Sequence, residues 1–474
     1  MASGAAFFDL DRTLLRGASG RVIGEALSEA GVTDRKIPGE RIIYRMYDLF
    51  GENRASMEVT RRAVRFASGW VRAQVQEAGE QAAEALAASL QPFARPLFAE
   101  HRAAGRPLVL ATTTPYDLVK PLADALGFDD VVATRYGEHE GVYDGTLDGE
   151  FVWGPGKLRA ISEWAAGQGI SLGESWAYSD SFYDLPMLAA VRHPVVVNPD
   201  PRLVVVALLR RWPVVHLDVP AGVPKLPVLG IEPQKALMSL VRPELIPYAR
   251  FDVSGVEHIP ATGPAIVVGN HRSYFDPMAM AVALAKRGRP VRFLGKKEVF
   301  DAPIVGQLAK AMGGIRVERG TGSDEPLAAA ALALEAGELV AMMPQGTIPR
   351  GPAFFDPVLK GRWGAARLAA MTGAPVIPIG LWGTERVWPR SERLPDLLAL
   401  GHPPTVSVRV GKAVPGLTGR SADADTKRIM TALSQLLPPE GRLPRVPTDE
   451  ELARTYPGGK IKETDEDARR PGRD

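Results

Sequence analysis

The sequence predicts an α/β protein of two domains, each built on a mostly parallel sheet with helices on both faces. Three observations support this prediction. The chain has 474 residues, which fits two or three domains of ~100–200 residues. Short apolar strands alternate with helical segments in both halves, and a stretch rich in proline and glycine, residues 218–233, separates the halves. With 45% hydrophobic and 24% charged residues, the composition is that of an ordinary globular protein.

The first half, residues 1–217, reads as a doubly wound, Rossmann-like domain. Buried strands are expected at 5–10, 107–112, 175–179 and 194–197, with helices at 116–126 and 157–167. Residues 18–104 consist mainly of long runs rich in Ala, Glu, Arg and Gln. We expect this block to be a helical cap inserted after the first strand, over the carboxyl edge of the sheet.

The second half, residues 234–440, repeats the alternation after the linker at 218–233. Its expected strands are 250–255, 265–269, 292–295, 314–318, 339–344, 375–381 and 405–411, with helices at 325–336 and 361–372. The segment 441–474 is rich first in proline and then in charge, which predicts a disordered tail.

Charge and cysteine content exclude several classes of function. The formal net charge is only +2, so we expect no nucleic-acid partner. The chain has no cysteine, which excludes disulfides, thiolate nucleophiles and Cys-ligated metal sites and fits a cytoplasmic protein. We expect neither a signal peptide nor a membrane span, because no run approaches the ~20 apolar residues that a span needs. Any membrane association would be peripheral.

The stretch "AAFFDLDRTLLRG" ends a buried strand with two carboxylates, Asp9 and Asp11. The carboxyl ends of parallel strands are where open α/β sheets place their ligands. A carboxylate at Asp9 can attack phosphorus, and Asp11 can exchange a proton with the leaving oxygen and with water. On this motif alone, a simple strand end is about as plausible an interpretation.

Further polar residues follow the later strands and strengthen the interpretation. Thr112 ends a strand in "ATTTP", and Lys157 opens a helix in "GPGKLRAI". Asp180 and Asp184 follow the strand at 175–179, and their oxygens, with those of Asp9 and Asp11, suit Mg²⁺. Each has a structural explanation by itself, but all in this order indicate a phosphate site.

Residues 5–217 resemble the haloacid dehalogenase-like phosphatases, in particular the branch with a helical cap that includes phosphoserine phosphatases. The matching motifs are "DLDRT", "ATTTP", "GPGK" and "SDSFYD". The resemblance implies Asp9 as nucleophile, Asp11 as acid and base, phosphate contacts from Thr112 and Lys157, and a Mg²⁺ ion near Asp180 and Asp184. One departure is Arg12, where glycine is common.

A second cluster follows the strand "AIVVG", where "NHRSYFD" places His271 and Asp276 five residues apart. This spacing allows a turn to bring the carboxylate onto the imidazole. A histidine oriented in this way can take a proton from an alcohol. Without further evidence, a structural hydrogen bond between the two is the more common explanation.

Candidate substrate-binding residues surround this pair in sequence. Arg319 follows a strand and could clamp a phosphate through two hydrogen bonds. Gly346 and Thr347 follow another buried strand, where exposed backbone N–H groups could polarise a carbonyl or hold a phosphate. The strand at 375–381 would line an apolar pocket.

Residues 234–415 resemble the glycerolipid acyltransferases, most closely the lysophosphatidate type. The family's H-x₄-D block matches His271 to Asp276, and its second and fourth blocks match 313–319 and 375–378. The third block departs from the family, because it reads Gln345-Gly346-Thr347-Ile348 where Glu-Gly-Thr-Arg is usual. Arg350 could replace the missing arginine, or Arg319 could hold the phosphate alone. The resemblance implies a lysophospholipid acceptor and an acyl thioester donor, acyl-CoA or acyl carrier protein.

An apolar stripe over residues 236–245, flanked by Lys235, Arg242 and Arg250, predicts a helix that could lie at a membrane surface. Packing against the domain core is an equally good explanation of the stripe. With the lipid substrates, the stripe suggests peripheral association with the inner face of the cell membrane.

Three hypotheses therefore remain. The chain could be a bifunctional enzyme of phospholipid synthesis that makes phosphatidate and also hydrolyses a phosphomonoester. It could have one active domain, the acyltransferase, with a regulatory or vestigial phosphatase module. It could also be a non-catalytic lipid-binding scaffold.

Overall fold

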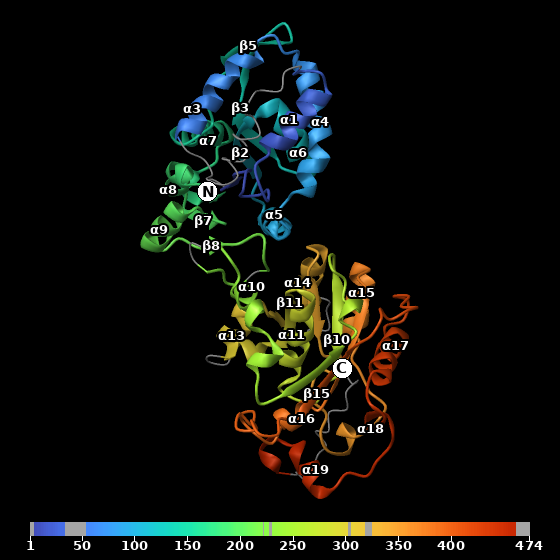
Figure 1. Ribbon diagram of the computed structural model, residues 1–474. Helices are drawn as coiled ribbons and strands as arrows, with labels where there is room; N and C mark the ends of the chain where they lie inside the picture. Colours follow the sequence, from blue (N-terminus) through green and yellow to red (C-terminus); the bar gives the residue numbers. More distant parts are fainter. Residues whose placement is uncertain are drawn as a thin grey trace. The chain divides into compact units, whose positions relative to one another are not determined.

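The computed structural model describes residues 4–33, 54–220, 222–226, 230–301, 305–317 and 325–460. The chain forms two compact units (Figure 1). Unit 1 contains Met1–Ala221 and Pro227–Gly230, and unit 2 contains Gly222–Leu226 and Ile231–Asp474.

Unit 1 is built on a six-stranded sheet of order β3-β2-β1-β6-β7-β8. Every neighbouring pair is parallel, as the doubly wound prediction requires. The strands are β1 (Ala6–Phe8), β2 (Leu108–Pro115), β3 (Asp130–Thr134), β6 (Trp176–Ser179), β7 (His193–Val197) and β8 (Val214–Val215). Strands β3 and β8 were not anticipated from the sequence.

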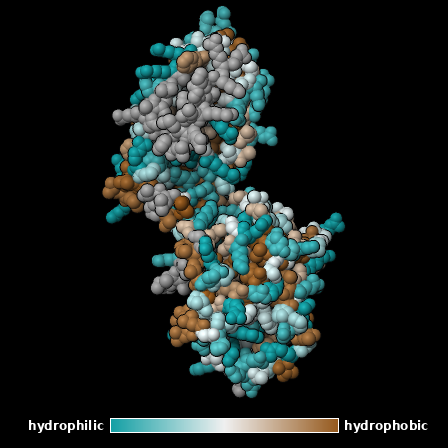
Figure 2. Space-filling view, viewed as in Figure 1, coloured by the Kyte–Doolittle hydropathy of each residue, from teal (hydrophilic) through white to brown (hydrophobic). Residues whose placement is uncertain are grey.

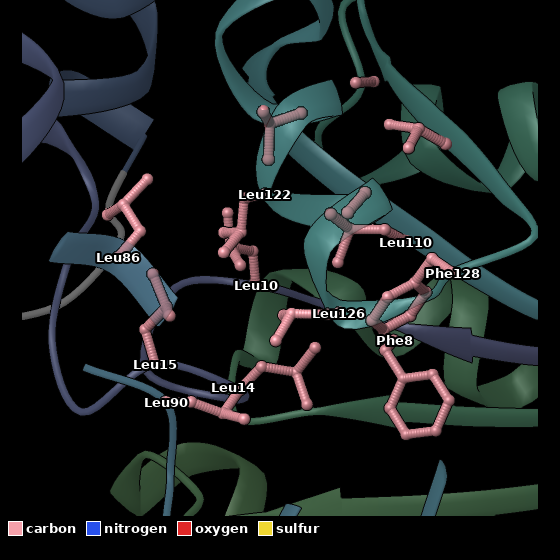
Figure 3. Close-up of a cluster of buried hydrophobic side chains, with 14 of the residues drawn as sticks. Phe8, Leu10, Leu14, Leu15, Leu86, Leu90, Leu110, Leu122, Leu126 and Phe128 are labelled. Atoms are coloured by element: carbon pink, nitrogen blue, oxygen red, sulfur yellow. The ribbon is translucent and has the colours of Figure 1, made fainter. Parts of the chain in front are cut away.

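The central strand β1 is buried on both faces because successive side chains point to opposite sides of a sheet. Phe8 belongs to a buried cluster that also contains residues of helices α4 (Arg72–Ala88), α5 (Ala94–Ala103) and α6 (Tyr116–Leu126). The close-up in Figure 3 shows Phe8 beside Phe128 and Leu110 in this layer. Phe7 packs on the other side, where the layer is formed by helices α7 (Pro155–Gln168), α8 (Leu185–Ala190) and α9 (Pro201–Arg210).

The segment expected as a cap is helical where it is described, with α1 (Gly20–Glu29), α3 (Arg54–Ala63) and η1 (Val64–Ala67) before α4. An unanticipated hairpin of β4 (Tyr136–His139) and β5 (Val142–Leu147) joins it, and the Gly69 N–H donates to the Tyr143 carbonyl at 2.9 Å. The prediction that the cap extends to residue 104 is wrong at its C-terminal end. The ring of Phe98, in α5, lies 5.3 Å from that of Phe8, so α5 covers the sheet instead.

Unit 2 contains a seven-stranded sheet of order β12-β11-β13-β10-β14-β15-β9, with β10 at its centre. The pair β14–β15 is antiparallel and the other pairs are parallel. The strands are β9 (Arg250–Ser254), β10 (Ala265–Gly269), β11 (Val291–Lys296), β12 (Ile315–Val317), β13 (Leu339–Met342), β14 (Val376–Trp382) and β15 (Thr405–Val410). All seven lie where the sequence predicted them.

Helices cover this sheet and lead into the loops that carry polar residues. They are α11 (Asp276–Arg287), α12 (Lys297–Asp301), α13 (Val305–Ala311), α14 (Glu325–Glu335), α15 (Gly364–Thr372), α16 (Thr384–Val387) and α17 (Ala422–Gln435). β10 is buried along its whole length, and a loop of six residues separates it from α11. The central strand therefore delivers its loop to the carboxyl edge of the sheet.

The single helix predicted over 236–245 is not formed. The segment divides into α10 (Pro233–Leu237) and the one-turn helices η4 (Met238–Leu240) and η5 (Pro243–Leu245). Proline disfavours a helical residue before it, and Arg242 is accordingly extended, with φ −119° and ψ 140°. No helix in the described part of the chain is long and apolar enough to cross a membrane.

The tail expected to be disordered is ordered up to residue 460. It forms α18 (Pro439–Arg442), α19 (Asp449–Arg454) and η8 (Pro457–Gly459). Thr448 and Glu451 close the start of α19 with a reciprocal capping box. The hydroxyl of Thr455 accepts a hydrogen bond of 2.8 Å from the N–H of Gly351, which ties the tail to the unit. Residues 461–474 lie outside the described part.

Candidate active sites

Parallel strands bring the carboxylates of unit 1 to one edge of the sheet. Asp9 directly follows β1, and its N–H donates to the Tyr178 carbonyl of β6 at 2.9 Å. Asp180 directly follows β6. Because β1 and β6 are paired neighbours, the first and fourth sequence motifs meet although 170 residues separate them.

Lys157 is the centre of this cluster. Its Nζ atom lies 2.7 Å from Asp9 Oδ1 and 2.7 Å from Asp184 Oδ2, and the side chain is 1% exposed. The main chain of Gly154, at φ 55°, precedes helix α7, which begins at Pro155 and points Lys157 inward. A buried ammonium needs this kind of pairing, because an isolated charge in the interior is very costly.

Asp180 and Asp184 are held by short polar side chains. Thr13 Oγ1 donates to Asp180 Oδ1 at 3.1 Å and accepts from the Asp180 N–H at 2.9 Å. Ser179 Oγ donates to Asp184 Oδ2 at 2.8 Å. The guanidinium of Arg12 lies 3.6 Å from Asp180 Oδ2, which explains the arginine at this position. Arg12 adopts φ 62°, a left-handed conformation that favours glycine.

The carboxylate of Asp11 is directed elsewhere. It accepts hydrogen bonds from the N–H of Ser19 at 2.5 Å and from the hydroxyl of Thr114 at 3.3 Å. Burial raises the pKa of Asp11 above its ordinary value, although these hydrogen bonds oppose the rise. A raised pKa favours the protonated carboxyl group, which is the form that an acid in catalysis needs. Thr112, two residues before Thr114, is also buried, and its hydroxyl accepts a hydrogen bond from the Thr114 N–H at 3.2 Å.

Three of the four residues predicted to bind a metal fit that role chemically. Asp9, Asp180 and Asp184 offer carboxylate oxygens, the donors that Mg²⁺ prefers. Asp184 Oδ1 is buried without a hydrogen-bond partner among the described residues, so it has a free acceptor position. Within the same residues, no three acidic or histidine side chains already surround a point suited to an ion. The contacts of Asp11 do not bring its carboxylate into this group.

In unit 2, His271 and Asp276 form a close pair. His271 lies in the loop after β10 and Asp276 is the first residue of α11. His271 Nδ1 is 2.7 Å from Asp276 Oδ2, which also accepts from the N–H groups of Arg272 at 2.6 Å and Ser273 at 2.8 Å. The carboxylate is fully buried, whereas the imidazole is 19% exposed. With Nδ1–H bound to the carboxylate, Nε2 is left to accept a proton.

Gln345, the residue that departs from the family pattern, braces this loop. Its Oε1 atom accepts from the His271 N–H at 2.6 Å, and the side chain is buried. A neutral amide provides this acceptor without adding a second buried negative charge beside Asp276. The amide therefore preserves the geometry of the histidine loop.

The other predicted binding residues of unit 2 fare differently. Gly346 donates its N–H to the Met343 carbonyl at 2.9 Å, so the proposed exposed donor is already used in a turn. Thr347 and Arg350 are half-buried in the same loop. Arg319 lies outside the described residues.

Sequence reasoning missed the supports on which this site rests. Arg272 forms two hydrogen bonds of 3.1 and 3.0 Å with Glu385, and its guanidinium lies 4.3 Å from the ring centre of Phe354 and 4.1 Å from that of Trp382. Burial opposes ionisation of Glu385, but Arg272 outweighs it and holds the pKa of Glu385 below its ordinary value. Arg272 is the residue after His271 in the sequence, but its partner Glu385 is 113 residues away, so local spacing could not reveal the pair.

These two clusters define two chemical classes: an aspartate-centred hydrolase unit and a histidine–aspartate transferase unit. Comparison with known proteins agrees. The model of the haloacid dehalogenase-like hydrolases matches residues 6–189, and the acyltransferase model matches residues 250–382. The chain belongs to the haloacid dehalogenase-like hydrolases through its N-terminal half and has an acyltransferase domain in its C-terminal half.

Several curated relatives match about half of the chain. The "Inhibition of morphological differentiation protein" of Streptomyces azureus is 34% identical over 247 residues, which cover 50% of this chain and 87% of the relative. "Phosphoserine phosphatase SerB1" of Mycobacterium tuberculosis is 35% identical over 212 residues, covering 44% of this chain and 69% of the relative. Among solved structures, the 1-acyl-sn-glycerophosphate acyltransferase PlsC of Thermotoga maritima is 22% identical, with a TM-score of 0.32, covering 43% of this chain and 78% of that one.

Proposed function

We propose that the chain is a bifunctional enzyme of phospholipid synthesis. Its acyltransferase unit transfers an acyl group from acyl-CoA or acyl carrier protein to the free hydroxyl of 1-acylglycerol-3-phosphate, giving phosphatidate. Its phosphatase unit hydrolyses a phosphomonoester. The contact between His271 and Asp276, with the imidazole partly exposed and the carboxylate buried, is the observation that carries the proposal.

In the acyl transfer, Nε2 of His271 takes the proton of the acceptor hydroxyl. The hydroxyl oxygen attacks the thioester carbonyl carbon, the carbon–sulfur bond breaks, and the imidazolium returns its proton to the leaving thiolate. Asp276 keeps the imidazole in one orientation and stabilises its positive charge. The two main-chain N–H groups on Asp276 Oδ2 hold that carboxylate in place.

In the phosphatase reaction, a carboxylate oxygen of Asp9 attacks phosphorus and the bond to the leaving oxygen breaks. Asp11 gives a proton to that oxygen, and burial, which raises the pKa of Asp11, favours this role. It then takes a proton from the water that hydrolyses the aspartyl-phosphate. Lys157 holds Asp9 in position, and Thr112 is the candidate contact for the phosphate oxygens.

Asp9, Asp180 and Asp184 would hold Mg²⁺. When bound, the ion neutralises negative charge on the phosphate that Asp9 attacks. Thr13, Ser179 and Arg12 orient two of these carboxylates through the contacts described above.

The acyltransferase proposal is tested on the full chain with labelled acyl-CoA and 1-acylglycerol-3-phosphate. We expect phosphatidate from the unaltered protein and loss of at least about a hundredfold in rate for His271→Ala. Asp9→Asn is the matched control, because it disables the other unit and leaves transfer unchanged. Absence of transfer to any lysophospholipid, with lipid binding retained, would support the scaffold hypothesis instead.

The phosphatase proposal needs a panel of phosphomonoesters, phosphoserine included, with and without Mg²⁺. We expect hydrolysis that requires the ion and disappears in Asp9→Asn but persists in His271→Ala. If no phosphomonoester is hydrolysed while acyl transfer proceeds, the phosphatase module is vestigial or regulatory.

Exposed leucines support peripheral membrane association. Leu394, Leu397, Leu398 and Leu400 follow α16 and are 52–87% exposed. Figure 2 shows hydrophobic surface at the edge of unit 2 where Figure 1 draws the orange segment beside α16. Hydrogen bonds from Trp388 to the Glu392 carbonyl (3.3 Å) and from the Asp396 N–H to the Val387 carbonyl (3.1 Å) fasten this segment to the site. Exposed Arg386 and Arg393 suit anionic lipid.

Flotation with vesicles containing anionic lipid tests this surface. Replacing the four leucines by serine should abolish flotation, whereas Leu208→Ser with Leu209→Ser, on exposed positions of α9, should leave it intact. A second variant replaces Leu237, Leu240 and Leu245, which are also exposed. Full flotation after loss of the four leucines would rule out their role.

A further inference from the structure

One arginine, Arg390, contacts the loop that contains a second arginine, Arg350. Arg390 follows α16, and one of its terminal nitrogens, Nη1, donates to the Ile348 carbonyl at 2.5 Å. The side chain of Tyr274 also interacts favourably with the guanidinium. Tyr274 lies three residues after His271, and Ile348 lies three residues after Gln345. Arg390 therefore bridges the histidine loop and the loop that braces it.

The second arginine, Arg350, repels Arg390 electrostatically. Burial first, and then this repulsion, lower the pKa of Arg390 below its ordinary value. No carboxylate in the described part of the chain forms an ion pair with either guanidinium. The nearest arginine of the histidine loop, Arg272, differs in this respect because Glu385 neutralises it.

Arg390 also has an unused donor. Its Nε–H is buried and has no hydrogen-bond partner among the described residues. An unpaired buried donor costs about 1–3 kcal/mol, and the positive charge of Arg350 adds repulsion that no counter-ion offsets. A dianionic group bound here would satisfy the donor and relieve the repulsion together. A guanidinium fork matches the geometry of a phosphate.

We infer that Arg390, together with Arg350, binds the phosphate monoester of the acceptor and so determines its specificity. The inference rests on the proposed acyltransferase activity. The Ile348 carbonyl holds one terminal nitrogen of Arg390, which leaves Nε–H and the second terminal nitrogen for the ligand. The phosphate groups of acyl-CoA share this chemistry, so the test must separate donor from acceptor.

The test compares 1-acylglycerol-3-phosphate with monoacylglycerol of the same chain, which lacks the phosphate. In Arg390→Gln we expect KM for the phosphorylated acceptor to rise by about 10- to 100-fold, with kcat and the rate on monoacylglycerol unchanged. Arg350→Gln should raise it less, and Arg390→Lys should recover part of the loss. Arg420→Gln, at an exposed position outside both loops, is the matched control and should change nothing.

Two results would overturn the inference. An equal loss on both acceptors would mean that Arg390 only supports the fold of the loops. A rise in KM for acyl-CoA, without one for the acceptor, would assign the arginines to the donor phosphate.

A third arm separates failure of this inference from failure of the proposed function. If the unaltered chain transfers acyl groups to no acceptor, calorimetry with sn-glycerol 3-phosphate is done on Asp9→Asn, which silences hydrolysis. Binding that weakens at least tenfold when Arg390→Gln is added supports the phosphate subsite even without turnover. Identical binding in the two variants rejects it.

Discussion

The two clusters of this chain achieve their geometry in opposite ways. In unit 1, the charges come from two strand ends and a helix, and a buried lysine connects Asp9 to Asp184 across 175 residues. In unit 2, His271 and Asp276 are five residues apart, and main-chain N–H groups of the same loop hold the carboxylate. The first is a long-range ionic cluster, and the second is a local turn with one distant brace, Gln345.

This difference teaches what each cluster contributes to stability. A buried ion network is costly to break, because removal of one partner leaves the others charged and unpaired. A partly exposed imidazole can be removed at little cost to the fold. We therefore expect the chemistry of unit 1 to be inseparable from its stability and that of unit 2 to be largely separable.

The largest effect is expected for Lys157→Met. The substitution removes the cation between Asp9 and Asp184 at a position that is 1% exposed, so it should lower the free energy of unfolding of unit 1 by about 3–5 kcal/mol. Denaturant unfolding of the full chain, followed by a unit 1 signal, measures it. Lys120→Met is the matched control, because Lys120 pairs with Asp124 at the surface and should cost at most about 1 kcal/mol. Equal losses in the two variants would contradict the comparison.

The second prediction concerns Asp276→Asn. The amide retains an acceptor for the loop N–H groups but cannot stabilise an imidazolium, so kcat for acyl transfer should fall about 100- to 1,000-fold. The free energy of unfolding should fall by no more than about 2 kcal/mol.

Asp425→Asn provides the control for this substitution. Asp425 is also buried and accepts main-chain hydrogen bonds, from Thr418 and Gly419, but it lies on α17, whose residues are not part of the dyad. Its replacement should cost similar stability and leave kcat unchanged. If Asp425→Asn lowers kcat as much as Asp276→Asn does, the rate loss reflects the fold and not the dyad.

The third prediction uses a histidine from unit 1 as a contrast to His271. His101 Nδ1 accepts from Arg106 at 2.7 Å, and Nε2 is 2.7 Å from the Tyr178 hydroxyl, so the ring is neutral. Burial, and then the charge of Arg106, lower the pKa of His101 to about 4. Between pH 6.5 and about 4 the unfolded chain takes up a proton that the folded chain does not, so stability is lost as pH falls through this window.

His101→Gln should remove this component of the acid sensitivity of unit 1. The slope of unfolding free energy against pH, measured from pH 4.5 to 6.5, should decrease by up to about 1.4 kcal/mol per pH unit relative to the unaltered chain. His139→Gln, at an exposed position of β4, should leave the slope unchanged. An unchanged slope in His101→Gln would mean that the ring is not kept neutral.

The comparison also explains what the sequence could predict. Apolar runs ending in Asp9 and His271 identified both central strands, because the strand and its polar end are adjacent in sequence. The Arg272–Glu385 pair and the role of Arg390 could not be predicted, because local spacing carries no information on partners a hundred residues away. Strand β3 and the hairpin β4–β5 were not predicted because their turn and strand signals are short. The order of the tail was not predicted because its composition is polar. Its order comes from contacts such as that of Thr455 with Gly351.

The smallest predicted effect tests whether the site of unit 2 is as local as its dyad suggests. Thr455→Val removes the acceptor for the Gly351 N–H, which follows Arg350 and is buried under the tail. The orphaned donor should cost about 1–2 kcal/mol of unfolding free energy. Because Gly351 continues the loop that begins at Gln345, KM for the acceptor should also rise about two- to fivefold, from less exact placement of Arg350.

Thr431→Val, on the exposed face of α17, is the matched control, because its hydroxyl bonds only within the helix, to the Lys427 carbonyl. It should change neither stability by more than about 0.5 kcal/mol nor KM. If Thr455→Val lowers stability but leaves KM unchanged, the tail supports the fold alone and the site is as local as the His271–Asp276 turn. If KM rises as expected, the site of unit 2 depends on residues from both ends of its sequence, as that of unit 1 does.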